Sequence, residues 1–159
     1  METNAASRHP PTLPHWLGWP LRHLPGPPPG VLALLNRVFA PVITRGELEF
    51  LRGRVLLLEI SDLGLELPLT VLGQHLHAPR GVQTDAHIAG RAYDFLQLAA
   101  GRADPDTLFF QRRLRMQGDT ELGLAVKNLL AGLDPAELLP GPLYKALQGA
   151  AGLAASWAE

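Results

Sequence analysis

Residues 104–119 read DPDTLFFQRRLRMQGD and contain signals for a turn, a strand and the start of a helix. The Asp-Pro-Asp at 104–106 is typical of a turn with capping side chains. Apolar and polar side chains alternate over residues 113–117, which predicts a strand that ends at Gly118. Asp119, or the threonine after it, is placed to cap a helix with an acidic first turn.

Four further strands are predicted before this stretch. Residues 55–61 are almost all apolar, which is typical of a strand covered on both faces. Residues 63–71 alternate cleanly, with leucine or valine at every second position. Residues 74–78 and 82–89 complete a predicted meander. Pro68 has no amide hydrogen for a ladder, so it indicates a sheet edge or a bulge.

Helices are expected before and after these strands in the sequence, so the predicted fold class is α+β. The apolar spacing predicts a helix from about Val31, with Pro41 interrupting or kinking it. Residues 102–107 are expected to form a loop, and the aromatic pair Phe109-Phe110 directly precedes the last strand. The other predicted helical segments are a turn over 47–51, a helix over 93–100 closed by Gly101, one after Asp119, and one over about 143–157.

Composition limits the possible classes of protein. The chain has 159 residues, 47% of them hydrophobic, which fits one domain with appendages and excludes a wholly disordered chain. A formal net charge of −1 argues against general nucleic-acid binding. The absence of cysteine excludes disulfides, thiolate catalysis and cysteine-based zinc sites. We expect a cytoplasmic protein, because no apolar run is long enough to span a bilayer and no signal peptide is evident.

The first 30 residues differ from the rest and are expected to form a leader. They hold 8 of the 15 prolines and two of the three tryptophans. Trp16, Trp19 and Arg22 are candidates for peripheral contact with the inner membrane. A leader that simply wraps the domain explains the same residues equally well. We therefore divide the chain into a leader at 1–30, a domain at 31–134 including its N-terminal helix, and a C-terminal helix at 135–159.

Catalytic motifs are not found, and the polar clusters have simpler explanations. His75, His77 and His87 could form a metal site, but histidines on a solvated sheet face are more common. Asp104 and Asp106 could act as a general acid and base, but Asp-Pro is a turn signal. We expect no catalytic residue, no metal and no cofactor.

Arg112, Arg113 and Arg115 form the only basic run. Such a run could bind phosphate or anionic lipid head groups. More often it is the solvated face of an amphipathic strand.

The order of these features resembles the sterol carrier protein type-2 domain over roughly residues 46–134. That family has a strand, a helix, a Gly-then-Asp/Pro loop, an aromatic pair, a strand ending in Gly-Asp and a closing helix. The matching segments here are 85–88 (DAHI), 93–96 (YDFL), 100–101 (AG), 104–110 (DPDTLFF) and 113–119 (RLRMQGD).

Within that family, the chain is most similar to accessory factors of oxygen-independent ubiquinone biosynthesis in proteobacteria. The residues that carry this closer resemblance are 46–54 (GELEFLRGR), 104–114 (DPDTLFFQRRL), 118–124 (GDTELGL) and 126–129 (VKNL). The leader and the C-terminal helix carry no motif of the family.

The resemblance implies a five-stranded, mostly antiparallel sheet covered by helices, with an internal hydrophobic tunnel and no catalysis. It implies polyprenyl quinone or phospholipid ligands, and as partners the anaerobic hydroxylase subunits related to U32 peptidases. The candidate lining residues are apolar side chains that could equally be plain core: Leu67, Leu69, Ile88, Phe95, Phe109, Phe110, Leu114, Met116, Leu122, Val126 and Leu129.

Two other functions stay open at this point. One is a structural scaffold that organises ubiquinone-biosynthesis enzymes without handling lipid. The other, more remote, is an enzyme that uses the three histidines.

Overall fold

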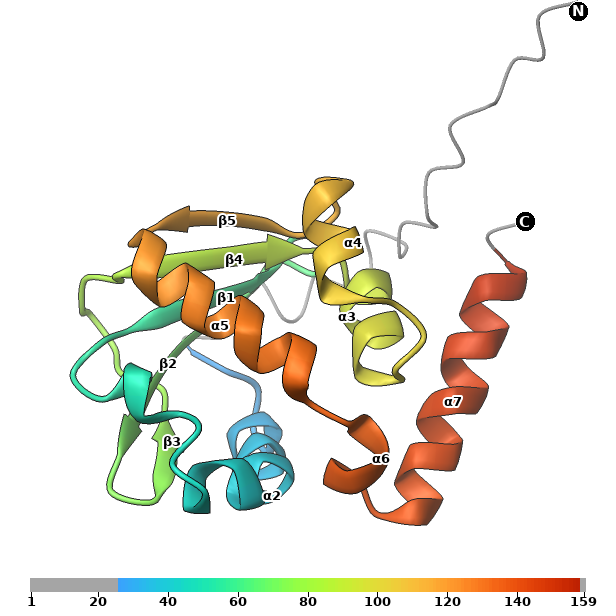
Figure 1. Cartoon of the computed structure of the whole chain (residues 1–159), viewed down its shortest axis with the longest axis horizontal. Coiled ribbons are helices and arrows are strands. Elements are labelled where there is room, and N and C mark those ends of the chain that lie inside the picture. The colour runs from blue at the N-terminus through green and yellow to red at the C-terminus, as the bar shows by residue number, and fades with distance from the viewer. Residues whose placement is uncertain (1–25, 158–159) are drawn as a thin grey trace, which may run out of the picture.

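The computed structural model describes residues 26–157 and contains one five-stranded sheet in the order β3-β2-β1-β4-β5 (Figure 1). The central pair β1–β4 is parallel, and the other three neighbouring pairs are antiparallel, so the sheet is mostly antiparallel as predicted. The strands are β1 (Leu56–Ile60), β2 (Leu65–Leu72), β3 (His75–His77), β4 (Ala86–Gly90) and β5 (Arg115–Gly118).

Strand register sorts the side chains into one apolar and one polar face. Leu58 pairs with Leu67 on β2 and with Ile88 on β4, and Ile88 pairs in turn with Met116 on β5. Directly paired residues project to the same side of a sheet, so these four form an apolar row across four strands. The opposite face carries Glu59, Glu66, His87 and Gln117, interspersed with Leu57, Pro68 and Ala89.

Pro68 lies where β2 has no outer neighbour among the described strands. β3 pairs only with Thr70–Leu72, so the part of β2 around Pro68 is paired on the β1 side alone. A missing amide hydrogen is tolerated there. The sequence prediction of an edge at Pro68 is confirmed.

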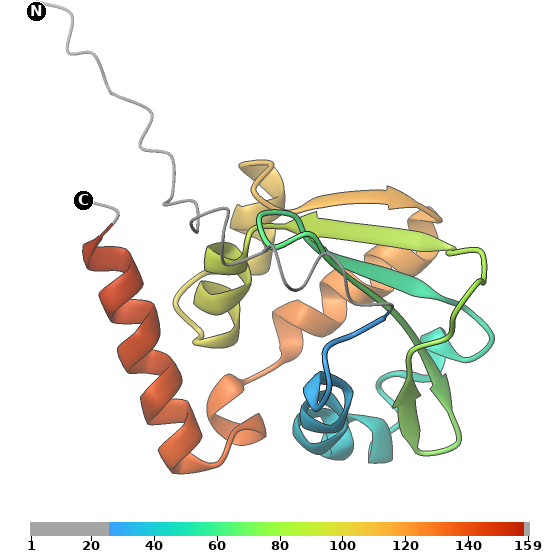
Figure 2. The same cartoon turned by 180° about the vertical axis from the view of Figure 1, so that it is seen from behind.

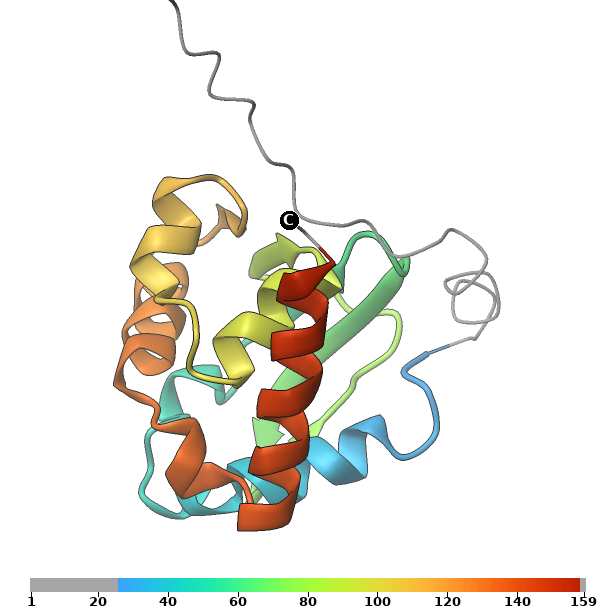
Figure 3. The same ribbon diagram turned by 90° about the vertical axis from the view of Figure 1, so that its right-hand side faces the viewer.

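Helices cover the apolar face. α5 crosses in front of the sheet in Figure 1 and behind it in Figure 2, so it lies on one face only. Its buried Leu122 and Val126 share a core with Val42 and Ile43 of α2. α7 stands at one end and packs on α3 (Figure 3). The helical segments are α2 (Val31–Thr44), η1 (Glu49–Leu51), α3 (Ala92–Ala99), α4 (Pro105–Phe110), α5 (Thr120–Gly132), α6 (Pro135–Leu138) and α7 (Gly141–Ser156).

Four sequence predictions about elements were wrong. The predicted meander does not form, because β4 pairs with β1 and not with β3. Residues 105–110 are helical, because Pro105 occupies the first helical turn and Asp104 Oδ2 accepts the Thr107 amide at 2.8 Å. The predicted interruption at Pro41 does not occur, because helix α2 continues through this residue, which lies exposed near its C-terminal end. Residues 82–85 lie outside the sheet, because β4 begins only at Ala86. No described helix is both long and apolar enough to cross a membrane.

Candidate functional site

The predicted lining residues lie mostly in the interior, in two apolar groups. Ile88 of β4 and Leu122 and Val126 of α5 are buried between the sheet and the helices, and Phe95, Met116 and Leu129 pack against them half-buried. Leu67 and Leu69 belong to the second group, beside Leu32 and Leu35 of α2. Leu114 is 1% exposed and Phe109 is half-buried.

Phe110 differs from the other predicted lining residues because its side chain is 92% exposed. It is the last residue of α4, whose inner face is formed by Leu108, fully buried at 0% exposure. Residues two apart in a helix point in widely different directions, so Leu108 and Phe110 cannot face the same interior. In this structure Phe110 therefore faces solvent rather than the interior.

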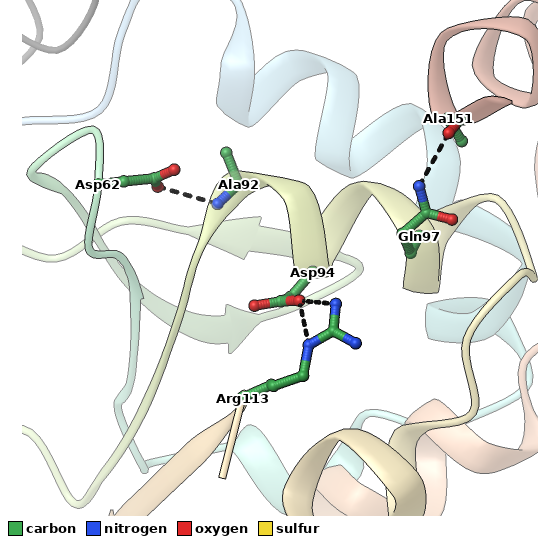
Figure 4. A network of polar contacts seen from close by, with 6 residues as sticks. All are labelled: Asp62, Ala92, Asp94, Gln97, Arg113 and Ala151. Atoms are coloured by element: carbon green, nitrogen blue, oxygen red, sulfur yellow. Dashed lines mark hydrogen bonds and ion pairs between the residues drawn. The ribbon is translucent and has the colours of Figure 1, made fainter. Parts of the chain in front are cut away.

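An ion pair between the buried Asp94 and the partly exposed Arg113 holds α3 against the segment that leads into β5 (Figure 4). Asp94 is 1% exposed, and Arg113 donates to its Oδ1 through Nε at 2.8 Å and through a terminal nitrogen. The guanidinium also lies 5.7 Å from the centre of the Tyr93 ring, a cation–π contact. Arg113 thus has a structural partner, whereas Arg112 and Arg115 are exposed.

Two further polar contacts hold α3 at its ends. Asp62 Oδ1 accepts the Ala92 amide at 2.9 Å, at the start of the helix. The buried side chain of Gln97 donates to the Ala151 carbonyl at 2.9 Å and so connects α3 to α7 (Figure 4). α3 is therefore positioned by the side chain of Asp62 in a turn, by Arg113 in the segment before β5, and by its own Gln97 bonded to the backbone of α7.

The histidines singled out in the sequence do not converge. His75 and His77 are exposed on β3, whereas His87 is on β4, and β2 and β1 lie between them. His87 Nε2 lies 2.7 Å from Glu59 Oε2, although the pair is not aligned for a hydrogen bond. Within residues 26–157, no group of three His, Cys, Asp or Glu side chains is arranged to hold a metal ion.

The two aspartates considered as acid and base have separate structural partners. Asp104 caps α4 through the Thr107 amide. Asp106 forms an ion pair with Lys127 of α5, with 2.7 Å between Oδ1 and Nζ. Asp104 therefore has the capping role that the sequence interpretation gave it, at the start of a helix.

A cavity of about 400 Å³ lies where α3, α5, α6 and α7 meet. None of the predicted lining residues contributes to it. Its wall combines apolar side chains with four that carry polar groups, and Leu130 and Leu133 also pack against the main core. The lining residues are Leu98, Gly101, Arg102, Ala103, Asp104, Pro105, Leu130, Ala131, Leu133, Asp134, Pro135 and Tyr144.

Sequence reasoning missed this cavity because its wall comes from segments far apart in the chain. The Asp-Pro pair at 104–105 indicates only a turn from the sequence, and the same pair recurs at 134–135. The structure places both pairs on the cavity wall, where Asp134 caps α6 by accepting the Ala136 amide at 2.9 Å. The candidate membrane residues Trp16, Trp19 and Arg22 lie outside the described residues.

Comparisons with known proteins agree on the fold. The model of the SCP-2 sterol transfer family matches residues 33–131. The Ubiquinone biosynthesis accessory factor UbiT from Escherichia coli K12 is 44% identical over 101 residues, and so is the protein of that name from Escherichia coli O157:H7. The match covers 64% of this chain and 58% of each relative, so the chain spans less than two thirds of their length.

One solved structure supports the same architecture. It is the "UbiJ-SCP2 Ubiquinone synthesis protein", which is 20% identical and superposes with a TM-score of 0.51. The superposition covers 64% of this chain and 90% of that one. At this identity the likeness concerns the fold alone.

Proposed function

The chain belongs to the SCP-2 sterol transfer family, and we propose that it binds polyprenylated quinone intermediates and presents them to enzymes of oxygen-independent ubiquinone biosynthesis. Its 44% identity to the UbiT accessory factors supports this pathway. The role is non-catalytic: the protein holds and delivers its ligand, and the chemistry occurs on partner enzymes.

One observation carries the proposal: the apolar face that runs across four strands and is covered by α2 and α5. A polyprenyl tail is almost insoluble in water, and its burial gains about 25 cal/mol per Å² of apolar surface. A layer between sheet and helices provides such burial. Met116, half-buried at the side of this layer, has a flexible side chain that can adapt to a long ligand.

We assign the ligand's tail to this layer. The residues proposed to line it are Leu67, Leu69, Ile88, Phe95, Phe109, Leu114, Met116, Leu122, Val126 and Leu129. Phospholipid is a second ligand that the same apolar layer would accept.

The proposal also includes partners and a membrane contact. The partners are the anaerobic hydroxylase subunits related to U32 peptidases, and Trp16, Trp19 and Arg22 make a peripheral contact with the inner membrane. Flotation of the full chain with anionic vesicles tests the contact. We expect the double variant Trp16→Ala/Trp19→Ala to float less than the wild type. Equal flotation of the two proteins would refute the proposed membrane contact by the leader.

Organic extraction of the purified full chain, followed by mass spectrometry, tests ligand binding. We expect a prenylated quinone or a phospholipid. Met116→Trp, which adds volume inside the apolar layer, should reduce the bound lipid, whereas its matched control Gln117→Trp on the opposite face should not. A protein that is lipid-free as purified and takes up no lipid from vesicles would refute the proposal.

A scaffold without lipid handling makes a different prediction. It would still capture the hydroxylase subunits when the Met116→Trp variant is used. Retained capture together with unchanged pathway activity in cells would favour that function over ligand delivery.

A further inference from the structure

We propose that the cavity between α3, α5, α6 and α7 is a head-group site, which receives a neutral ring bearing oxygen acceptors while the apolar tail runs toward the core. This inference rests on the proposed lipid binding and specifies which end of the ligand lies where. The cavity volume of about 400 Å³ falls in the range of small-molecule sites, about 300–1,000 Å³.

The first argument is the arrangement of donors around Gln148 on α7. Gln148 Nε2 donates to the Ala100 carbonyl and also to Tyr144 Oη, the latter at 2.9 Å. Its Oε1 accepts from Arg102 Nε at 3.0 Å. One amide therefore orients both Tyr144 and Arg102, and these two side chains, unlike Gln148 itself, line the cavity.

These bonds leave donors available for a ligand. Tyr144 Oη acts as an acceptor toward Gln148, so its own hydrogen is free to be donated elsewhere. The terminal nitrogens of Arg102 make no hydrogen bond to any residue within 26–157. The cavity thus offers a hydroxyl and a guanidinium donor, which suit carbonyl or methoxy oxygens on a ring.

The second argument is the charge of the wall, which favours a neutral ligand over a phosphate. One guanidinium, that of Arg102, is accompanied by the carboxylates of Asp104 and Asp134. Both carboxylates are fixed as helix caps, so they cannot turn away from an incoming anion. The net negative charge of the wall would repel a phosphate, whereas it would not repel a neutral quinone ring.

The third argument is continuity with the apolar interior. Leu130 and Leu133 line the cavity and also pack against the main core. A head group held by Tyr144 and Arg102 would therefore leave its tail on the side of these leucines. The α7 side of the cavity lies outside residues 33–131, the part matched by the family model, so this site is a feature that the matched domain alone does not provide.

The experiment measures head-group preference with full-length protein. Two fluorescence-displacement titrations compare a ubiquinone with two prenyl units and an isoprenoid hydrocarbon of matched tail length that lacks the ring. The wild type should prefer the quinone. Tyr144→Phe should weaken quinone binding about fivefold, the loss of one hydrogen bond, and leave hydrocarbon binding unchanged. Arg102→Met should act in the same direction.

Matched controls separate the site from general effects. Tyr93→Phe and Arg115→Met make the same chemical changes away from the cavity and should alter neither titration. Equal binding of quinone and hydrocarbon by the wild type, or a preference untouched by both cavity variants, would overturn the head-group site alone. Failure of the wild type to bind either probe would instead refute the proposed lipid binding and this inference with it.

A third titration, with phosphatidylglycerol of short chain length, identifies an anion site. If Tyr144→Phe and Arg102→Met weaken this lipid and not the quinone, the cavity takes a phosphate and the proposal of a neutral ring is wrong. Thermal unfolding of each variant confirms that the fold is retained.

Discussion

Removal of Arg113 should destabilise the domain strongly, because it leaves the carboxylate of Asp94 buried without its partner. Asp94 is 1% exposed, and both nitrogens that Arg113 presents to it are bound to the same oxygen. Breaking a fully buried pair by deleting one partner typically costs about 3–5 kcal/mol, and the lower end of that range applies here because the Arg113 side chain is 30% exposed. The lost cation–π contact with Tyr93 adds roughly 0.5–1 kcal/mol.

We therefore expect Arg113→Met to lower the free energy of unfolding by about 3 kcal/mol, with a fall in Tm of roughly 8–15 °C for a domain of this size. Urea denaturation followed by circular dichroism measures the first quantity, and a thermal scan the second. The double variant Asp94→Leu/Arg113→Met removes both charges and should recover most of the loss, because an apolar pair of similar volume can replace a buried ion pair.

Arg115→Met is the matched control, since Arg115 lies exposed only two residues later, at the start of β5, and should change stability by no more than about 0.5 kcal/mol. A loss below about 1 kcal/mol for Arg113→Met would refute the assignment of this pair as the anchor of α3. A double variant as unstable as the single one would show that the uncompensated carboxylate is not the cause.

Three other outcomes are expected. Gly118→Ala should cost at least about 2 kcal/mol by urea denaturation, because Gly118 has φ of +93° and a Cβ there would lie 2.5 Å from the Asp85 carbonyl oxygen. The Leu122 amide, assisted by Arg54, lowers the pKa of the Asp119 carboxyl. The ionised Asp119 carboxylate therefore contributes its full stabilisation above about pH 4, the pKa of an aspartate in the unfolded chain, and this contribution is lost as the pH falls through the lower pKa of the folded state. The variant Asp119→Asn should lack this loss when the free energy of unfolding is measured from pH 7 to pH 2. Phe110→Ser should leave stability within about 0.5 kcal/mol, whereas Leu108→Ala should cost about 2–5 kcal/mol; equal effects would contradict the orientation of α4.

The strands were predictable because their signal is local. Alternation over 63–71 placed β2 (Leu65–Leu72), and the apolar run at 55–61 placed β1 (Leu56–Ile60). The cap at Asp119 was also evident, since a cap depends on a few consecutive residues. Such features are encoded within a single turn or strand and need no tertiary contact.

The candidate site was less predictable because its features depend on tertiary packing. The Asp-Pro at 104–105 fits a turn and a helix start equally well, so α4 was missed. Without that helix, the aromatic character of Phe110 suggested burial, whereas helical periodicity turns it outward. The cavity needs α7 to pack beside α3, which is arranged by Gln97 and Gln148 over about 50 residues of sequence.

The parallel pairing of β1 with β4 has a consequence for folding kinetics. Leu56 pairs with Ala86, 30 residues later, whereas β1 and β2 form a local hairpin. The hairpin can therefore form early, and α2, which precedes it in the chain, can cover Leu67 and Leu69. The part of the apolar face that packs against α5 stays uncovered until that helix, which comes later in the chain, has formed. The apolar layer that we propose to hold a prenyl tail is thus also the surface through which a partly folded chain would associate.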